Sequence, residues 1–283
     1  MSGRSSSVVI LYDASGNAVA VKGASATPVA SDNALVVSLS PNSAPIGVST
    51  APANSNSGLA VGYITTSSTT DVPIRSTTYT EQAADAQRSI ASSSASDTAA
   101  GTGARTVKIT YYDSTGAGPF TETVTLNGTT AVATASSTIC FIEKMEVMTV
   151  GSTGSNVGTL TLFVNNAGGG GTIGTIAATI NRTFWAHHYV PTGKTTYVTA
   201  VTGHNNNNSN ATTLSLRAKP IGGTAPEQVI GSYVRVAGSS SIQSSLDYNQ
   251  AIFAVGPARV ILYGAPESNP AIITRAAFAF YDV

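Results

Sequence analysis

The side chains best suited to chemistry in this 283-residue chain gather around two adjacent histidines. His187 and His188 follow Phe184, Trp185 and Ala186, in the densest aromatic cluster of the sequence. Neighbouring residues of a β-strand point to opposite faces, so these imidazoles would not share a metal ion within one chain. The pattern favours a core or subunit-interface cluster of Trp185, His187 and His188 with one imidazole hydrogen-bonded. The alternative is that, in a threefold assembly, one of these histidines lies close to the same histidine of the neighbouring copies.

Two short motifs suggest ligand binding but lack a required part. Gly193-Lys194-Thr195 ends like a phosphate-binding loop, yet His188 stands where such a loop has its first glycine. Asn205–Asn208 offers amide oxygens to calcium without the carboxylates that a hard cation prefers. We therefore expect a strand after Gly193 and a polar loop at the asparagines, with neither nucleotide nor metal bound.

The carboxylates and the single cysteine do not form a catalytic set either. The acidic residues do not form a spaced pair beside aromatic platforms, and there is no Gly-x-Ser-x-Gly elbow. Glu143 and Glu146 flank Lys144 and are expected to make surface ion pairs. Cys140 lies among apolar residues, which favours a small buried side chain over a reactive thiol. The sequence thus predicts a non-enzymatic protein with no catalytic residue, cofactor or metal.

The composition is unusually poor in charge. Only 10% of the residues are charged and the formal net charge is zero, whereas ordinary soluble domains carry about 25% charged residues. The sequence has no basic stripe of the kind that follows phosphates, so we expect no nucleic-acid partner. The apolar run Val8–Leu11 is too short for a signal peptide or a membrane span, so we expect no membrane partner and synthesis in a cytoplasm. A surface of hydroxyls and amides suits a protein packed among copies and neighbours.

Period-two alternation dominates the chain after residue 104. Val107, Ile109 and Tyr111 alternate with polar residues and predict a strand with one inward face. Asp113–Gly116 supplies a turn. Around ten such short runs, separated by Gly, Asn and Pro turns, predict an all-β fold, a β-sandwich of jelly-roll type.

Two shorter stretches carry more specific expectations. Asn127-Gly128 is a strong hairpin signal and predicts that 121–126 pairs with 129–134. Glu81–Gln87 could open a short helix, but the serines of 92–96 favour extended chain or coil, so both alternatives stay open.

The N-terminal quarter has a different character. Prolines at 41, 45, 52 and 73 stand among Ser, Asn and Gly, so this stretch cannot build its own core. We predict an extended arm with short strands over 1–75, including a hairpin over 8–21, and expect a partner to hold it. A linker or first strand would follow over 76–104, and the sandwich over 105–283. The candidate assembly contacts in the arm are its alternating apolar residues: Val8, Ile10, Tyr12, Leu35, Val37 and Leu39.

Several segments resemble structural proteins of tailed bacteriophages. Ala100–Thr110, Glu122–Thr130 and Gly151–Leu160 look like a β-rich segment of such proteins, and Tyr12–Val19 is similar to the hairpins that open many of them. The resemblance covers about residues 8–21 and 97–164. It implies a virion component, homotrimeric or otherwise repeated, and brings no catalytic residues.

Three functions follow as hypotheses. The first is a capsid decoration or cement protein whose arm binds the major capsid protein or a neighbouring copy. The second is a tail, collar, baseplate or fibre component whose loop 205–210 faces the host. The third, from another class, is a carbohydrate-binding β-sandwich with Trp185 and the tyrosines as a platform, for which a host surface glycan would be the partner. The first two place the protein in the virion, and the copy number per particle separates them.

Overall fold

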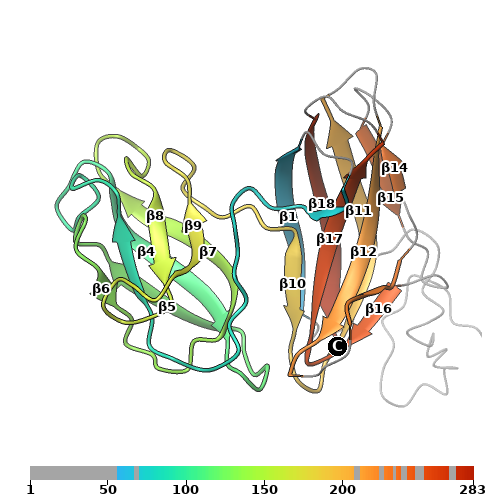
Figure 1. The fold of residues 1–283 in the computed structure, drawn as a ribbon, viewed down its shortest axis with the longest axis horizontal. Coiled ribbons are helices and arrows are strands. Elements are labelled where there is room, and N and C mark those ends of the chain that lie inside the picture. The colour runs from blue at the N-terminus through green and yellow to red at the C-terminus, as the bar shows by residue number, and fades with distance from the viewer. Residues whose placement is uncertain are drawn as a thin grey trace, which may run out of the picture. The chain divides into compact units, whose positions relative to one another are not determined.

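The computed structural model describes residues 56–66, 70–206, 211–222, 226–231, 234–236, 241–245, 252–267 and 272–283. All of these belong to one compact unit, Ser49–Val283. Every regular element among them is a β-strand, so this part of the chain has no helix that could cross a membrane. The hairpin expected over 8–21 lies outside the described residues. The prediction of an all-β sandwich is confirmed (Figure 1).

One pair of antiparallel sheets, which we call the first sandwich, is built from the middle of the chain. Its first sheet has the order β6-β3-β8-β9 and its second the order β5-β4-β7. The strand bounds are β3 Ser89–Ser92, β4 Ala104–Tyr112, β5 Phe120–Thr125, β6 Val132–Ala133, β7 Phe141–Val150, β8 Leu160–Phe163 and β9 Thr172–Ile176.

The second sandwich combines the two ends of the described chain. One sheet has the order β1-β18-β11-β15, with β16 also on β11; the other has the order β10-β17-β12-β13, with β14 on β12 and β2 on β17. Its strands are β1 Asn56–Thr66, β2 Val72–Pro73, β10 His187–Val190, β11 Thr195–Asn205, β12 Thr212–Pro220, β13 Gln228–Val229, β14 Val234–Val236, β15 Ser241–Ser245, β16 Ile252–Val255, β17 Ala258–Pro266 and β18 Ile272–Asp282. Strands β1 and β2 thus fall within the range expected to form the arm.

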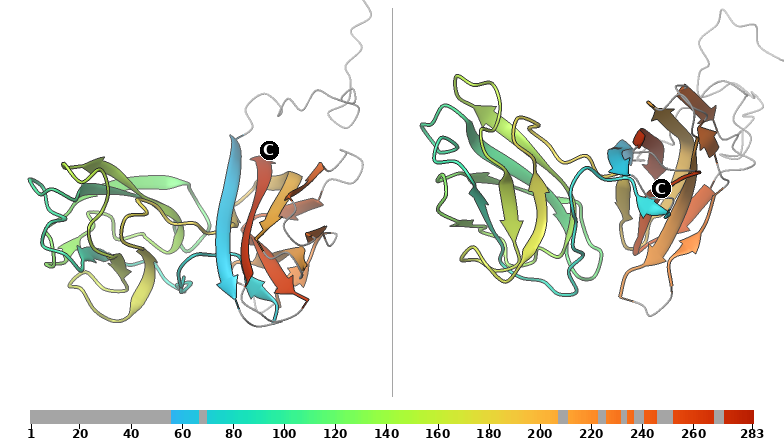
Figure 2. Two further views of the ribbon diagram at one scale, coloured as in Figure 1. Left: turned by 90° about the horizontal axis from the view of Figure 1, so that it is seen from above. Right: turned by 45° about the horizontal axis from the view of Figure 1, so that its top comes forward.

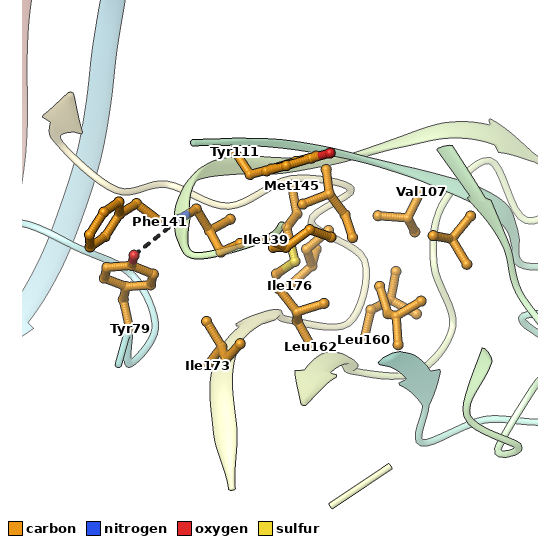
Figure 3. Packing of buried hydrophobic residues seen from close by; sticks show 14 of the residues in the cluster. Tyr79, Val107, Tyr111, Ile139, Phe141, Met145, Leu160, Leu162, Ile173 and Ile176 are labelled. Carbon is orange, nitrogen blue, oxygen red and sulfur yellow. Dashed lines mark hydrogen bonds between the residues drawn. The ribbon is translucent and has the colours of Figure 1, made fainter. Parts of the chain in front are cut away.

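Each sandwich encloses its own core. Figure 3 shows the first, where Ile139, Met145, Leu160 and Leu162 pack together without exposure to solvent. The inward face predicted for Val107, Ile109 and Tyr111 is confirmed, since all three are buried. The second core mixes Leu214, Leu216 and Phe278 with several alanines.

The turn after β4 is confirmed, because the Asp113 carboxylate accepts hydrogen bonds from the backbone N–H groups of Thr115 and Ala117. This turn joins β4 to β5, which pair in register over six residues. The residues 81–87 are not helical, and they form no strand beyond a single bridge between Ala86 and Ile139.

The hairpin predicted at Asn127-Gly128 is wrong in its pairing. Gly128 does adopt the left-handed turn conformation, with φ of 59°. However, the chain beyond it joins the other sheet, where β6 pairs with β3. The Gly128 N–H is taken by the Asp97 carbonyl oxygen, and the Glu122 carboxylate accepts the N–H groups of Ala135 and Ser136. These long-range contacts outweigh the local turn preference.

Candidate functional site

The two adjacent histidines begin strand β10 and lie in separate environments, as alternation along a strand requires. His187 packs among aromatic rings, with its ring centroid 5.1 Å from that of Tyr79, 5.6 Å from Trp185 and 5.4 Å from Tyr189. Its Nε2 lies 3.0 Å from the Ile142 carbonyl oxygen, so this nitrogen carries the proton and donates it. His187 is therefore a neutral, hydrogen-bonded core residue.

His188 instead lies between two carboxylates. Its Nδ1 is 3.0 Å from Glu143 Oε1 on β7, and its Nε2 is 3.1 Å from Asp282 Oδ1 on β18. Both ring nitrogens face acceptors, so both must carry protons and the ring is an imidazolium. The Phe280 ring stacks on it at a centroid distance of 3.7 Å. We call Glu143, His188 and Asp282 the histidine clamp.

Further hydrogen bonds fix the carboxylates of the clamp. The Tyr189 N–H donates to Glu143 Oε2 at 2.9 Å, and the Thr196 hydroxyl donates to Asp282 Oδ1. Three strands of the second sandwich and β7 of the first are thereby joined through one buried charge network. Among the polar side-chain atoms of the clamp, only Asp282 Oδ2 has no hydrogen-bond partner in the described part of the chain.

The two histidines have pKa values shifted in opposite directions. Burial lowers the pKa of His187 from 6.5 to about 4. Burial would lower the pKa of His188 as well, but the Glu143 and Asp282 carboxylates outweigh it and raise that pKa to about 9. At neutral pH the first ring is uncharged and the second is charged.

A second buried ion group surrounds Arg259 on β17. Its guanidinium pairs with the carboxylates of Glu81 and Glu227, and the latter also accepts the Tyr263 hydroxyl at 3.1 Å. The net effect of burial and these neighbouring anionic groups is a raised pKa of Arg259. The Arg217 guanidinium lies 4.2 Å above the Tyr263 ring. These contacts tie residues before β3 to the sheet of β12 and β17.

A third polar centre is the carboxylate of Asp97, which is wholly buried. It accepts hydrogen bonds from the Ser92 hydroxyl and from the backbone N–H groups of Ala104, Val157 and Gly158, at 2.6 to 2.9 Å. Burial opposes ionisation, but these donors outweigh it and lower the pKa of Asp97. The carboxylate joins the loops before β4 and β8.

The Gly-Lys-Thr sequence and Cys140 lie in the local structures that the sequence predicted. Gly193 lies in a turn and strand β11 begins at Thr195, so no helix follows the Gly-Lys-Thr sequence. Cys140 is buried, and burial raises the pKa of its thiol to about 12, which leaves it unreactive. Among the described residues no group of three His, Cys, Asp or Glu side chains is placed to hold a metal ion.

The residues predicted to form an interface cluster are buried in the fold. Trp185, His187 and His188 expose 4%, 2% and 3% of their surface, and the Trp185 Nε1–H donates to the Thr77 hydroxyl. A contact of this cluster with another subunit stays a prediction. The candidate assembly contacts Val8, Ile10, Tyr12, Leu35, Val37 and Leu39 lie outside the described residues. The loop expected at Asn205–Asn208 is described only to Asn206, where Asn205 is a buried end of β11.

The sequence prediction missed the acidic half of the clamp. Glu143 was expected at the surface with Glu146; that prediction holds for Glu146, which pairs with Lys144 at 3.1 Å, and is wrong for Glu143. Residues three apart on a strand point to opposite faces, so the sequence could have predicted that only one of these two glutamates is at the surface. Asp282, 94 residues from His188 in the chain, left no local signal.

Comparisons with known proteins give little further guidance. No family model matches the chain, and no curated protein matches it. Two solved structures of infectious bursal disease virus, of the Gx and Gt strains, align with 80% and 81% of this chain and 71% of their own chains. Their TM-scores are 0.24 and 0.23, at 6% and 8% identity. At these values the alignments carry no argument about family or function.

Proposed function

We propose that this chain is a non-enzymatic structural protein of a bacteriophage virion, a capsid decoration or cement protein that stabilises the shell through its N-terminal arm. The observation that carries this proposal is where the arm joins the fold. Residues 1–55 lead directly into β1, an outer strand of the second sandwich that pairs with β18 alone among the described strands. The arm therefore leaves from a sheet edge, from which it can reach a neighbouring subunit.

The interior chemistry supports a structural role. Three buried charged groups, those of His188, Asp97 and Arg259, are held by partners of this chain. Their hydrogen bonds connect strands and loops that are far apart in sequence. In the described part of the chain, these hydrogen bonds and ion pairs hold distant segments together and stiffen the fold. Such stiffness suits a protein that withstands mechanical load in a particle.

The charge-poor composition supports assembly by shape and backbone contacts. Exposed large apolar side chains among the described residues include Leu59, Val255 and Val283, at 62%, 63% and 48% exposure. Such residues suit contacts with neighbouring copies or with a shell. Partners in the proposed particle are further copies, in a homotrimer, and the major capsid protein.

Deletion of the arm tests this function. The deletion should end at residue 48, because β1, β2 and the buried Ile74 belong to the second sandwich and a deletion to residue 75 would remove them. The remaining unit retains both hydrophobic cores. We expect it to stay folded but to be lost from purified particles, as measured by quantitative mass spectrometry of virions. Normal incorporation of the truncated chain would contradict the proposal.

The full-length chain in the same measurement distinguishes positions in the particle. A decoration protein is expected at hundreds of copies per virion, whereas a tail, neck or fibre component is expected at a dozen or fewer.

A further inference from the structure

Among the described residues, strand β1 is paired along one edge only. Its eleven residues pair in continuous antiparallel register with β18, from Asn56 opposite Asp282 to Thr66 opposite Ile272. In the described part of the chain, the backbone of 57–65 makes no hydrogen bond on its other side. Figure 2 shows β1, in blue, beside β18. A row of backbone donors and acceptors is thus left open along this edge.

In the first half of β1 the larger side chains lie on the outward face. The inward positions there are small, Gly58, Ala60 and Gly62, whereas Ile64 in the second half packs against the core. A Cβ at Gly58 would lie 2.6 Å from the Phe280 ring, so the core side has no room for more. The larger side chains, Leu59 and Val61, lie on the opposite face, and Leu59 is 62% exposed. A one-residue slip would force Leu59 against Phe280, which fixes the register of β1.

In the described part of the chain, two other strands at sheet ends, β9 and β7, have covered outer edges. The outer edge of β9 receives the Thr80 N–H at the Ile173 carbonyl, and β7 is bridged by 181–183 through the Val147 and Met145 backbones. Strand β7 also carries acidic and basic side chains. By contrast β1 contains no charge, no proline and no bulge, which are the features that normally protect an edge from pairing. An edge of this kind is suited to accept an added strand.

The sequence contains a segment that matches this edge. Ala34–Leu39 is uncharged, and its apolar residues Leu35, Val37 and Leu39 alternate along one face. Beside the start of β1 lies a shallow hollow whose lining includes Leu59, Thr199 and Tyr281. An apolar side chain of an added strand can fill this hollow.

The connection to β1 is too long for a hairpin, and its length allows the segment to reach a second copy. Residues 40–55 separate this segment from β1 and include prolines at 41, 45 and 52. Hairpin loops usually have about two to five residues, so a sixteen-residue connection is far from a hairpin.

We propose that the first half of β1, Ser57–Val61, binds Ala34–Leu39 of a second copy of this chain by β-strand addition. This rests on the proposed function, because it names the surface that receives the arm. Backbone hydrogen bonds supply the affinity, and Leu35 and Val37 pack beside Leu59 on the outward face. Repeated around a ring, the contact links each copy to the next.

The test uses the full-length chain with two acidic substitutions in the arm. In Leu35→Asp/Val37→Asp, buried carboxylates would oppose docking on an apolar strip. We expect a shift from oligomer to monomer in light scattering. The alternate β1 amides that face away from β18 should exchange about tenfold faster or more, while those bonded to β18 keep their protection. The matched control, Ser43→Asp/Thr50→Asp, adds the same charge between the prolines at 41, 45 and 52 and should change neither measurement.

A single substitution on the receiving strand tests the same contact from the other side. Leu59→Lys places a charge on the exposed face and should also yield monomers. Combining Leu59→Lys with Leu35→Asp/Val37→Asp in one chain should restore the oligomer, because every contact then joins opposite charges.

Three results would overturn the inference: unprotected outward amides in the full-length oligomer, protection that survives in monomers, or no response to the acidic pair. If one of these results is found while the variant lacking residues 1–48 is absent from particles, the proposed function stands and only this contact is rejected.

Discussion

The two sandwiches differ in how they close. The core of the first is filled by large side chains, among them Ile109, Ile142 and Leu162, and its strands β7 and β9 are covered by backbone contacts. The second core contains many alanines, including Ala60, Ala258 and Ala276, and β1 pairs on one edge only among the described strands. Large apolar burial and covered edges favour a self-sufficient body. The second sandwich has smaller core side chains and contains the buried charged residues His188 and Arg259, and it is the one that we propose for assembly.

The largest expected effect lies at the histidine clamp, where contacts of the two sandwiches meet. His188→Ala would leave the Glu143 and Asp282 carboxylates buried without their cation. Breaking a buried ion pair from one side costs about 3–5 kcal/mol, so we expect a loss of that order in the free energy of unfolding, measured by urea denaturation. The control is Lys144→Ala, which removes an exposed partner of Glu146 and should cost less than about 1 kcal/mol. Equal losses in the two variants would show that the clamp does not join the sandwiches.

A cavity in the first core should have a slightly smaller effect and a local one. Leu162→Ala removes a fully buried side chain and is expected to cost about 2–5 kcal/mol. If the two cores are separate cooperative units, amide exchange should accelerate in β3, β4 and β8 and stay slow in β11 and β18. Leu216→Ala, in the second core, is the reciprocal variant. If either substitution accelerates amide exchange equally in both sandwiches, the two cores are not separate cooperative units.

The opposite pKa shifts of the histidines predict a stability maximum near pH 6.5. The raised pKa of His188 contributes stability that is complete below about pH 6.5 and is lost as the pH rises through about 9. The lowered pKa of His187 acts in the other direction, so its contribution is complete above about pH 6.5 and is lost as the pH falls through about 4. Each shift of about 2.5 pH units corresponds to about 3 kcal/mol at full burial.

Melting temperatures across pH 4 to 10 would measure both limbs. His188→Gln should flatten the alkaline limb and His187→Gln the acidic limb, because glutamine does not titrate. A variant that lowers stability equally at every pH would contradict the assignment of that limb to its histidine.

Local sequence pattern was sufficient for much of the first sandwich. Alternation placed Val107, Ile109 and Tyr111 in the core, and Asp113–Gly116 formed the expected turn, since side chains two residues apart and a carboxylate beside its own backbone act at short range. The Asn127-Gly128 turn was also foreseen, but its pairing was not. That pairing depends on Asp97 and Glu122, whose backbone and carboxylate contacts with this segment are long-range.

The candidate site divides in the same way. The separation of His187 and His188 onto opposite faces follows from strand geometry alone. The charge state of each ring does not, because it depends on Glu143 and Asp282, which arrive from β7 and β18. Glu143 and Asp282 are 45 and 94 positions away from His188 in the sequence, and no spacing rule predicts contacts over such separations.

By itself, the sequence determined the all-β class, the charge-poor surface, and the alternating faces of individual strands, because these depend on composition and on a period of two residues. Tertiary structure alone decided which strands pair, that β1 closes a sheet with β18 at the far end of the chain, and that one histidine is an imidazolium while its neighbour is neutral. Those outcomes are set by burial and by partners distant in sequence, and such partners leave no trace in the local pattern.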